Sequence, residues 1–366
     1  MPFVDLLPSH EGIRDRLIDE IGELVDCGAF TNGPHVAEFE RAFARYCGVG
    51  TCVGVASGLD ALRLGLHALG LEPGGEVIVP ADTFAATFEA VLQAGGTPVP
   101  VDASERDYNV DVDAARAAIG PRTRGILPVH LYGQLTDMRA VAELARERGL
   151  WILEDACQAH GARRDGIGAG EAGDAAAFSF YPAKNLGAFG DAGALVTGDD
   201  VLAERVRALR EHGQTAKYHH ELVGYTSRLD TLQALVLLRK LPLLDAWNEA
   251  RRAAARAYGE SLAGIGDLAL PPVPDGSEPV WHLYVVRTAA PERLAEFLRA
   301  HGIGTARHYP QPPHLAPAYR SLGYGRGAFP VAEALADECL SLPMFPGIAD
   351  RQLELVITVV REFFGA

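Results

Sequence analysis

The lysine at position 184 has the surroundings that point most directly to chemistry. It lies in the segment FSFYPAKNLGAFGD (178–191), among aromatic, proline and glycine residues rather than the charged neighbours of an exposed helical lysine. The chain contains only three lysines, Lys184, Lys217 and Lys240, and arginine cannot replace a primary amine as a nucleophile. Because apolar surroundings lower the pKa of an amine, Lys184 is a candidate Schiff-base nucleophile, although a lysine at the surface remains the alternative. Lys240 follows Arg239 in a helical pattern, so we expect it at the surface.

Other polar residues follow apolar segments that are predicted to be strands. Asp155 ends the run LWILED, and a carboxylate at the end of a buried strand needs a cationic or protonated partner. Ser57 and Gly58, in VASGLDAL, stand between a predicted strand and a predicted helix. Free N–H groups at such a helix N-terminus can receive a phosphate. Each feature alone fits an ordinary structural cap equally well.

The histidines and glycines lack the spacing of two common kinds of site. None of the twelve histidines belongs to an H-E-x-x-H motif, and His219 and His220 have no carboxylate at ligand spacing, so we expect no metal. The segment GIGAG (166–170) does not lead from a strand into a helix. A Rossmann oxidoreductase therefore lacks its glycine fingerprint here.

The candidate groups together match the requirements of pyridoxal 5′-phosphate (PLP). This cofactor needs a lysine for its aldehyde, an acid facing its ring nitrogen, an anion site for its phosphate and an aromatic side chain against its ring. Lys184, Asp155, the Gly58 turn with Ser179, and Phe84 in PADTFAAT supply one candidate for each requirement.

Short apolar segments and helical patterns alternate through the first two thirds of the chain. Strands are predicted at 52–56, 76–80, 97–102, 124–130, 150–156, 175–180 and 193–197. Helices are predicted at 10–27, 34–46, 58–69, 83–93, 112–118, 136–148, 200–212 and 229–241. Strands that are apolar on both faces favour an α/β fold with a mostly parallel central sheet flanked by helices. Ligands of such sheets bind at the carboxyl ends of the strands.

The pattern changes after about residue 241. The remaining chain combines one predicted strand at 281–287 with predicted helices at 243–263, 291–301, 331–340 and 350–364. This mixture is typical of a smaller α+β domain. We therefore predict a large PLP-binding domain over residues 1–241 and a small C-terminal domain over residues 242–366.

Composition narrows the class of protein. The chain has 366 residues and a formal net charge of −15, which argues against general binding to nucleic acid or to an anionic membrane surface. Its 48% hydrophobic and 22% charged residues are typical of a globular enzyme. Five cysteines without C-x-x-C spacing, and a first segment without a signal-peptide pattern, favour a cytoplasmic location.

The sequence resembles the nucleotide-sugar aminotransferases of the DegT/DnrJ/EryC1/StrS family. The resemblance runs along nearly the whole chain, through FVDL, TNGPHVAEFERAF, SGLDAL, PADTFAAT, EDACQAHGA, FSFYPAKNLGA, SRLDTLQA and HYPQPPHLAPAY to LSLP. It implies an aspartate-aminotransferase-like fold. It also implies PLP-dependent transfer of an amino group from L-glutamate to a nucleotide-linked keto sugar.

The resemblance implies a role for several of the candidate residues. Lys184 corresponds to the lysine that binds the cofactor's aldehyde and later shuttles the proton. Asp155 would pair with the pyridine nitrogen and Gln158 would bond the ring hydroxyl oxygen. Phe84 would lie on the face of the ring. A dehydratase branch of the family has histidine in place of the lysine, so Lys184 argues against that branch.

The phosphate end of the implied site departs from the family pattern at two positions. Ser179 and the backbone amides of Gly58 and Leu59 would hold the phosphate, and the family usually has threonine where Leu59 stands. A dimer partner usually completes each site from a segment that corresponds here to GYTSRL (224–229). Thr226 in that segment stands where the family usually has asparagine. The resemblance therefore implies a homodimer with shared sites.

The substrate end resembles the branch that acts on 3-keto nucleotide sugars, usually linked to dTDP. This resemblance is carried by VHLYGQ (129–134), KYHH (217–220) and HYPQPPHL (308–315). Tyr181, His308 and Tyr309 correspond to residues near the sugar and the nucleotide. The implied acceptor is a dTDP-3-keto-6-deoxyhexose. A 4-keto sugar and a non-catalytic regulatory protein that retains a PLP site are the alternatives.

Overall fold

The computed structural model describes residues 1–366 and is built around a seven-stranded sheet. The strands lie in the order β1 (Thr51–Val55), β9 (Gly193–Thr197), β8 (Ala175–Ser179), β5 (Trp151–Asp155), β4 (Thr123–Ile126), β2 (Glu76–Pro80) and β3 (Thr97–Val101). Every strand except β9 runs in the same direction, because β9 pairs antiparallel with both β1 and β8. The expected mostly parallel α/β sheet is confirmed.

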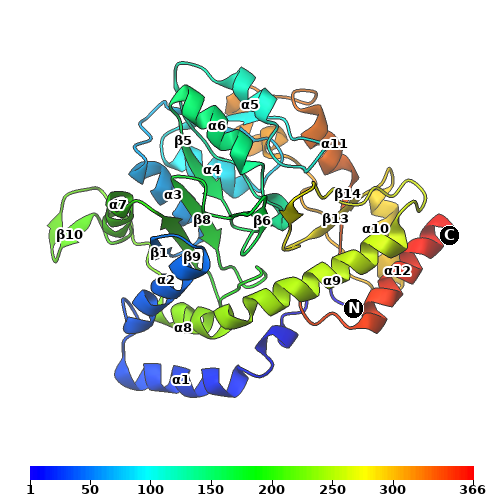
Figure 1. Cartoon of the computed structure of the whole chain (residues 1–366), viewed down its shortest axis with the longest axis horizontal. Helices are drawn as coiled ribbons and strands as arrows, with labels where there is room; N and C mark the ends of the chain where they lie inside the picture. Colours follow the sequence, from blue (N-terminus) through cyan, green and yellow to red (C-terminus); the bar gives the residue numbers. More distant parts are fainter.

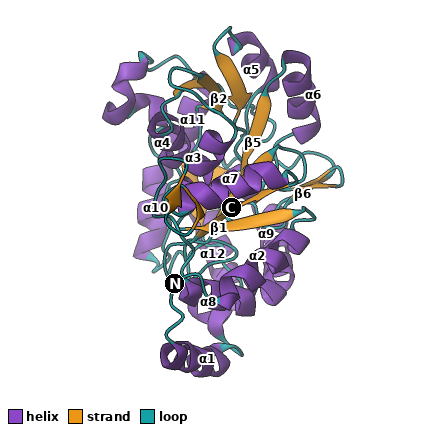
Figure 2. Cartoon of the chain, turned by 90° about the vertical axis from the view of Figure 1, so that its left-hand side faces the viewer, coloured by secondary structure: helices purple, strands orange, loops and turns teal.

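Helices cover both faces of this sheet (Figures 1 and 2). One face packs against α2 (Pro34–Tyr46), α5 (Val112–Ala118), α6 (Met138–Arg148) and α8 (Thr231–Lys240). The other face packs against α3 (Gly58–Ala68), α4 (Ala85–Gln93) and α7 (Asp200–Arg210). Successive strand side chains point to opposite faces, so neighbours such as Ile152 and Leu153 belong to different hydrophobic clusters. This two-sided burial explains why the strands are continuous apolar runs.

The C-terminal part combines helices with a small antiparallel pair of strands. β13 (Tyr284–Arg287) pairs with β14 (Cys339–Leu342), and the helices are α9 (Leu244–Leu262), α10 (Pro291–Ala300), α11 (Pro330–Glu338) and α12 (Asp350–Phe364). A third hydrophobic cluster contains only buried residues from Ala254 onward. However, Leu283 and Val285 pack in the core of the large sheet. The boundary at residue 241 therefore stays a prediction.

Several small elements were absent from the sequence prediction. A three-stranded sheet joins β12 (Ser277–Glu278), β6 (Arg163–Arg164) and β7 (Ile167–Gly168). The 3₁₀ helices are Leu7–His10, Leu131–Gly133, Leu241–Leu243, Pro313–Leu315 and Pro317–Leu322. The predicted helix 331–340 was too long, because α11 ends at Glu338 and β14 begins at Cys339. Strands of two to four residues carry too few side chains to establish a period in the sequence.

Two segments extend from the body of the molecule. The hairpin of β10 (Gln214–Ala216) and β11 (His219–His220) reaches outward beyond α7, and α1 (Arg14–Cys27) lies at one end of the molecule in both views (Figures 1 and 2). α1 buries Leu17 and Leu24, with Leu17 packed against Leu235 and Val236 of α8, but leaves Ile18 and Val25 exposed. No helix has the length and apolar character needed to cross a membrane.

Candidate functional site

A cavity of about 450 Å³ lies where the strands of the central sheet end. The chain segments that follow β1, β2 and β5 line it with Gly58, Phe84 and Gln158, and β8 contributes Ser179 at its last position. Because these four strands are parallel, their carboxyl ends meet at one edge of the sheet. Residues from four separate segments of the sequence therefore share one cavity.

Ten of the eleven site residues predicted from the sequence line this cavity. They are Gly58, Leu59, Phe84, Asp155, Gln158, Ser179, Tyr181, Lys184, His308 and Tyr309. The eleventh, Thr226, does not line it. The roles assigned to these residues stay predictions, but their grouping is a property of the fold.

Lys184 lies in the irregular segment after β8. Its backbone N–H donates to the carbonyl of Tyr181 at 2.8 Å, which fixes the turn. Its side-chain amine faces the cavity and makes no hydrogen bond or ion pair within the chain. Burial lowers the pKa of Lys184, and the nearby Cys157 and Asp155 oppose part of the shift. A half-buried amine without a partner is available as a nucleophile or base.

Asp155 is held in a fixed orientation at the end of β5. It is 7% exposed, and its Oδ2 accepts a hydrogen bond from Thr87 Oγ1 at 2.9 Å. Its Oδ1 accepts from the backbone N–H of Cys157 at 3.2 Å. Thr87 in turn bonds Thr83 at 2.8 Å between their hydroxyl oxygens. Sequence reasoning missed both threonines, although PADTFAAT places them four residues apart at the start of α4.

The start of α3 forms a cradle suited to an anion. A Cβ on Gly58 would lie 2.7 Å from the Cβ of Ser179, so only glycine allows this approach. Ser57 caps the helix by accepting from the N–H of Asp60 at 3.1 Å. The N–H groups of Gly58 and Leu59 bond no group of the protein. These two donors and the Ser179 hydroxyl match the chemistry of a phosphate group.

The opposite side of the cavity comes from the C-terminal part of the chain. His308 Nδ1 lies 2.8 Å from Ser341 Oγ, and Tyr132 OH donates to the His308 carbonyl at 2.5 Å. Gln158 Nε2 donates to Tyr309 OH at 3.1 Å. Burial lowers the pKa of His308 to about 4, with a contribution from the charge on Lys184. This imidazole is therefore neutral near pH 7.

Aromatic side chains line the cavity on both sides. Phe84 and Tyr181 are each 54% exposed, and the Phe84 ring centroid lies 5.4 Å from that of Tyr309. Phe3 stacks on the His308 ring at 5.6 Å and also lines the cavity. Sequence reasoning missed Phe3, because nothing in the motif FVDL signals a contact with position 308.

Thr226 lies outside the cavity of its own chain. It is exposed, and its Oγ1 lies 3.1 Å from His212 Nε2. The next residue, Ser227, is buried and donates to Asp60 Oδ2 at 2.8 Å. The GYTSRL segment therefore contacts the start of α3 through Ser227, while Thr226 does not line this cavity.

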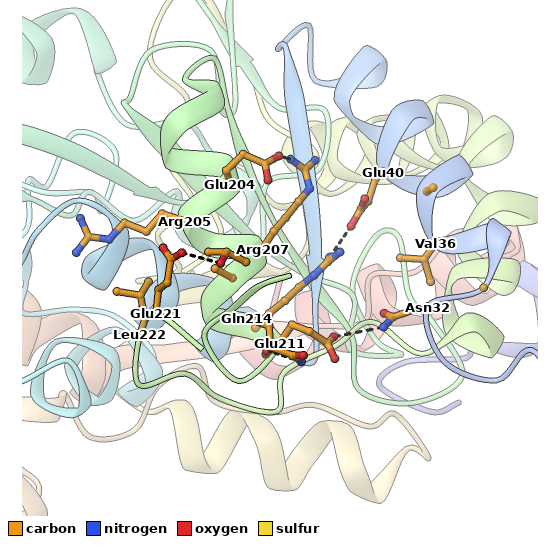
Figure 3. Close-up of a pocket in the computed structure, with 15 residues that line it drawn as sticks. Asn32, Val36, Glu40, Glu204, Arg205, Arg207, Glu211, Gln214, Glu221 and Leu222 are labelled. Carbon is orange, nitrogen blue, oxygen red and sulfur yellow. Dashed lines mark hydrogen bonds and ion pairs between the residues drawn. The ribbon is translucent and has the colours of Figure 1, made fainter. Parts of the chain in front are cut away.

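A wider groove of about 640 Å³ lies between α2, α7 and the base of the β10–β11 hairpin (Figure 3). Arg210 Nη1 donates to Glu40 Oε1 at 2.5 Å, and Asn32 Nδ2 donates to Glu211 Oε2 at 3.3 Å. Glu211 also forms an ion pair with Arg228. These contacts tie α2 to the segments on either side of the hairpin. None of the predicted site residues lies in this groove.

The expectation that Lys240 lies at the surface was wrong. Lys240 is 3% exposed, and its Nζ donates to the carbonyl of Gly187 at 2.8 Å. It also lies 3.2 Å from His10 Nε2 and 4.9 Å from the centroid of the Phe189 ring. The helical pattern around Arg239 gave no sign that this face of α8 packs behind the Lys184 segment.

Comparison with known proteins identifies the family of the chain. Residues 11–361 match the DegT/DnrJ/EryC1/StrS aminotransferase family. The chain belongs to this family. The resemblance inferred from the motifs is thereby confirmed, and the protein is an aminotransferase. Members of the family depend on PLP, and solved structures similar to this chain include PLP and PMP forms.

Individual relatives cover almost the whole chain. A dTDP-3-amino-3,4,6-trideoxy-α-D-glucose transaminase of Streptomyces venezuelae is 48% identical over 99% of this chain and 96% of its own length. A pleiotropic regulatory protein of Geobacillus stearothermophilus is 42% identical over 100% of this chain and 98% of its own length. The crystal structure of S. venezuelae DesV matches with a TM-score of 0.97 and 48% identity, covering 100% of this chain and 98% of that one.

Proposed function

We propose that this aminotransferase transfers the amino group of L-glutamate to C-3 of a dTDP-linked 3-keto-6-deoxyhexose. The observation that carries the proposal is the unpartnered amine of Lys184, which shares one cavity with a buried carboxylate and a free helix N-terminus. The sugar named for the S. venezuelae transaminase, 48% identical to this chain, supports the class of acceptor and the position of amination.

The residues of the cavity fit the cofactor of the family. The free amides of Gly58 and Leu59 and the Ser179 hydroxyl would hold the phosphate. Asp155 would face the ring nitrogen, and its two hydrogen bonds keep the carboxylate in one orientation. When bound, PLP supplies an electron-withdrawing ring that stabilises negative charge on the carbon that loses its proton.

Lys184 would move the proton in both half-reactions. Its Nζ would accept the proton from Cα of glutamate and hold it for return to the cofactor, and in the sugar half-reaction it would move a proton in the reverse direction. Burial of Lys184 favours the neutral amine that a base requires. Phe84 would lie against the cofactor ring, and Gln158 would bond its hydroxyl oxygen.

Tyr181, His308 and Tyr309 would bind the sugar nucleotide. The neutral imidazole of His308 and the two phenol groups can donate to and accept from sugar hydroxyls. Hydrogen bonds from two sides of the cavity would hold the pyranose in one rotation, which decides whether C-3 or C-4 meets the cofactor. Amination at C-4 is the alternative outcome.

We also propose that the protein is a cytoplasmic homodimer with shared sites. Thr226 lies outside the cavity of its own chain. Tyr218, in the protruding β10–β11 hairpin, is 80% exposed, and Val223, just after the hairpin, is 95% exposed. Such apolar exposure is typical of an interface. All five cysteines are free, in keeping with a reducing compartment. If sedimentation showed that the active enzyme is strictly monomeric, the proposal that two protomers share each site would be wrong.

The two half-reactions can be measured separately. PLP-loaded protein mixed with L-glutamate alone should release one 2-oxoglutarate per site and lose its visible cofactor absorbance. Addition of the 3-keto dTDP-sugar should restore that absorbance. Protein that binds PLP but never forms 2-oxoglutarate, with or without a keto sugar, would instead support a non-catalytic regulatory role.

A further inference from the structure

His282 lines the same cavity, and neither the sequence motifs nor the family roles assigned it. Its Nδ1 is buried without a hydrogen-bond partner, and its Nε2 bonds no group of the protein. His160 also has unpartnered ring nitrogens, but it packs against Phe178 and Phe180 in the core and does not line the cavity. His282 thus lines the cavity with neither ring nitrogen bonded, whereas His308 has its Nδ1 bonded to Ser341.

The backbone around His282 is pinned on both sides. The N–H of Val280 donates to the carbonyl of Gly133 at 2.9 Å, and the N–H of Leu283 donates to the carbonyl of Tyr132 at 3.3 Å. A Cβ on Gly133 would lie 3.0 Å from the backbone nitrogen of His282, and Gly133 has a φ of +91°. A side chain at position 133 would therefore push the His282 segment away from the strand ends.

Two further features fix the turn itself. Trp281 has a φ of +47°, which is costly for a bulky side chain and persists only where the surroundings enforce it. The buried Arg251 donates from Nη1 to the carbonyls of Trp281 at 3.0 Å and His282 at 3.4 Å. A strained, pinned turn that ends in an unbonded imidazole is a geometry suited to a ligand contact.

The charges and burial around His282 indicate which kind of ligand its imidazole can bind. Burial lowers the pKa of His282 well below its ordinary value, and the charges of Lys184 and Arg251 contribute in the same direction. A neutral imidazole has one N–H donor and one nitrogen acceptor. That combination suits a hydroxyl group, which both donates and accepts. A carboxylate only accepts and would be better served by a cation.

We propose that His282 is a substrate-binding residue whose imidazole hydrogen-bonds a hydroxyl group of the keto-sugar acceptor. His282 and His308 then form one hydroxyl-binding wall opposite the strand ends. This inference rests on the proposed sugar aminotransferase function, and it concerns the acceptor rather than glutamate.

The test compares His282→Phe, His282→Asn and, as a matched control, His301→Asn, because His301 is exposed at the end of α10. His282→Phe should lower kcat/KM for the 3-keto dTDP-sugar roughly tenfold or more, while the glutamate half-reaction stays within about twofold of wild type. His282→Asn keeps a donor and an acceptor, so it should recover part of the loss. Unfolding temperatures of all three variants check that the fold is intact.

A second readout separates binding from a structural role. In protein with ¹⁵N-labelled histidine, the imidazole signal that disappears in His282→Asn should shift when the aminated dTDP-sugar is added. An unshifted signal, or an equal loss of both half-reactions in His282→Phe, would overturn the inference. Normal sugar amination by both His282→Phe and His282→Asn would overturn the inference about His282 but not the proposed function. A wild-type enzyme that aminates no keto sugar would overturn the proposed function as well.

Discussion

The two walls of the cavity differ in origin and in charge. The sheet wall, formed by the strand ends with Asp155 and Lys184, carries the ionisable groups suited to proton transfer. The C-terminal wall, formed by His282, His308 and Tyr309, presents imidazoles whose pKa values burial has lowered, and a phenol. The difference suggests a division of labour. We propose that the sheet wall serves both half-reactions, whereas the C-terminal wall selects the acceptor.

Side-chain hydrogen bonds join the two walls. Gln158 donates to Tyr309 OH, and Tyr132 donates to the His308 carbonyl. Because these contacts join residues far apart in the sequence, they place the acceptor wall relative to the strand ends. Variants that affect one wall alone are therefore the way to test the division.

The largest effect is expected at Lys184. Lys184→Ala removes the amine that we propose binds the aldehyde and moves the proton, so both half-reactions should slow by more than roughly 10³-fold. The visible absorbance of bound PLP should change as well. Lys184→Arg keeps a positive charge without a primary amine and should be equally impaired. Normal turnover by either variant would contradict the role of Lys184.

A smaller effect, again on both half-reactions, is expected at Asp155. Asp155→Asn keeps the shape and an oxygen for Thr87, but it removes the carboxylate that we propose faces the ring nitrogen. Loss of one such electrostatic partner typically costs about 10²–10³-fold in kcat. Single-turnover rates should fall by similar factors with glutamate and with the sugar. A rate loss confined to the sugar half-reaction would contradict the proposed division of roles between the two walls.

The effect at His308 should be confined to one half-reaction. His308→Ala leaves a buried hydroxyl of the bound sugar without its partner and should lower kcat/KM for the sugar roughly tenfold. The rate of 2-oxoglutarate formation from glutamate should stay near that of wild type. Equal losses in both reactions would show that the C-terminal wall does more than bind the acceptor.

The last effect concerns stability rather than turnover, and it is expected behind the sheet wall, at Lys240. Burial lowers its pKa from 10.5 to about 8, so between these values the unfolded chain binds the extra proton and stability rises with pH. Relative to Lys240→Met, the wild-type free energy of unfolding should therefore rise by up to roughly 1.4 kcal/mol per pH unit over this window. Denaturant titrations at pH 8, 9 and 10 measure it. The exposed Lys217→Met is the matched control, and a pH-independent difference for Lys240→Met would contradict the burial of its charge.

The sheet wall could be predicted from the sequence because its positions are set locally. Asp155 and Ser179 end strands whose apolar runs are recognisable, and parallel strands bring their carboxyl ends to one edge. Gly58 was found for the same reason, as the first residue of a helix after a strand. Strand and helix bounds agree with the prediction within a few residues for the same elements.

The C-terminal wall and the back of the sheet wall depend on long-range packing. His308 and Tyr309 were found only through the family motif, and nothing near His282 in the sequence shows that Gly133 and Arg251 pin its backbone. The burial of Lys240 depends on Gly187, which lies 53 residues away. Periodicity describes which face of an element is apolar, but it does not identify the partner of that face.

The position of the new amino group tests the account most directly. The PMP form of the wild-type enzyme is offered 3-keto and 4-keto dTDP-6-deoxyhexoses in separate reactions, with L-glutamate as the donor, and each product is examined by NMR. We predict a product from the 3-keto sugar alone, with nitrogen at C-3. A product aminated only at C-4 would contradict the acceptor wall described above.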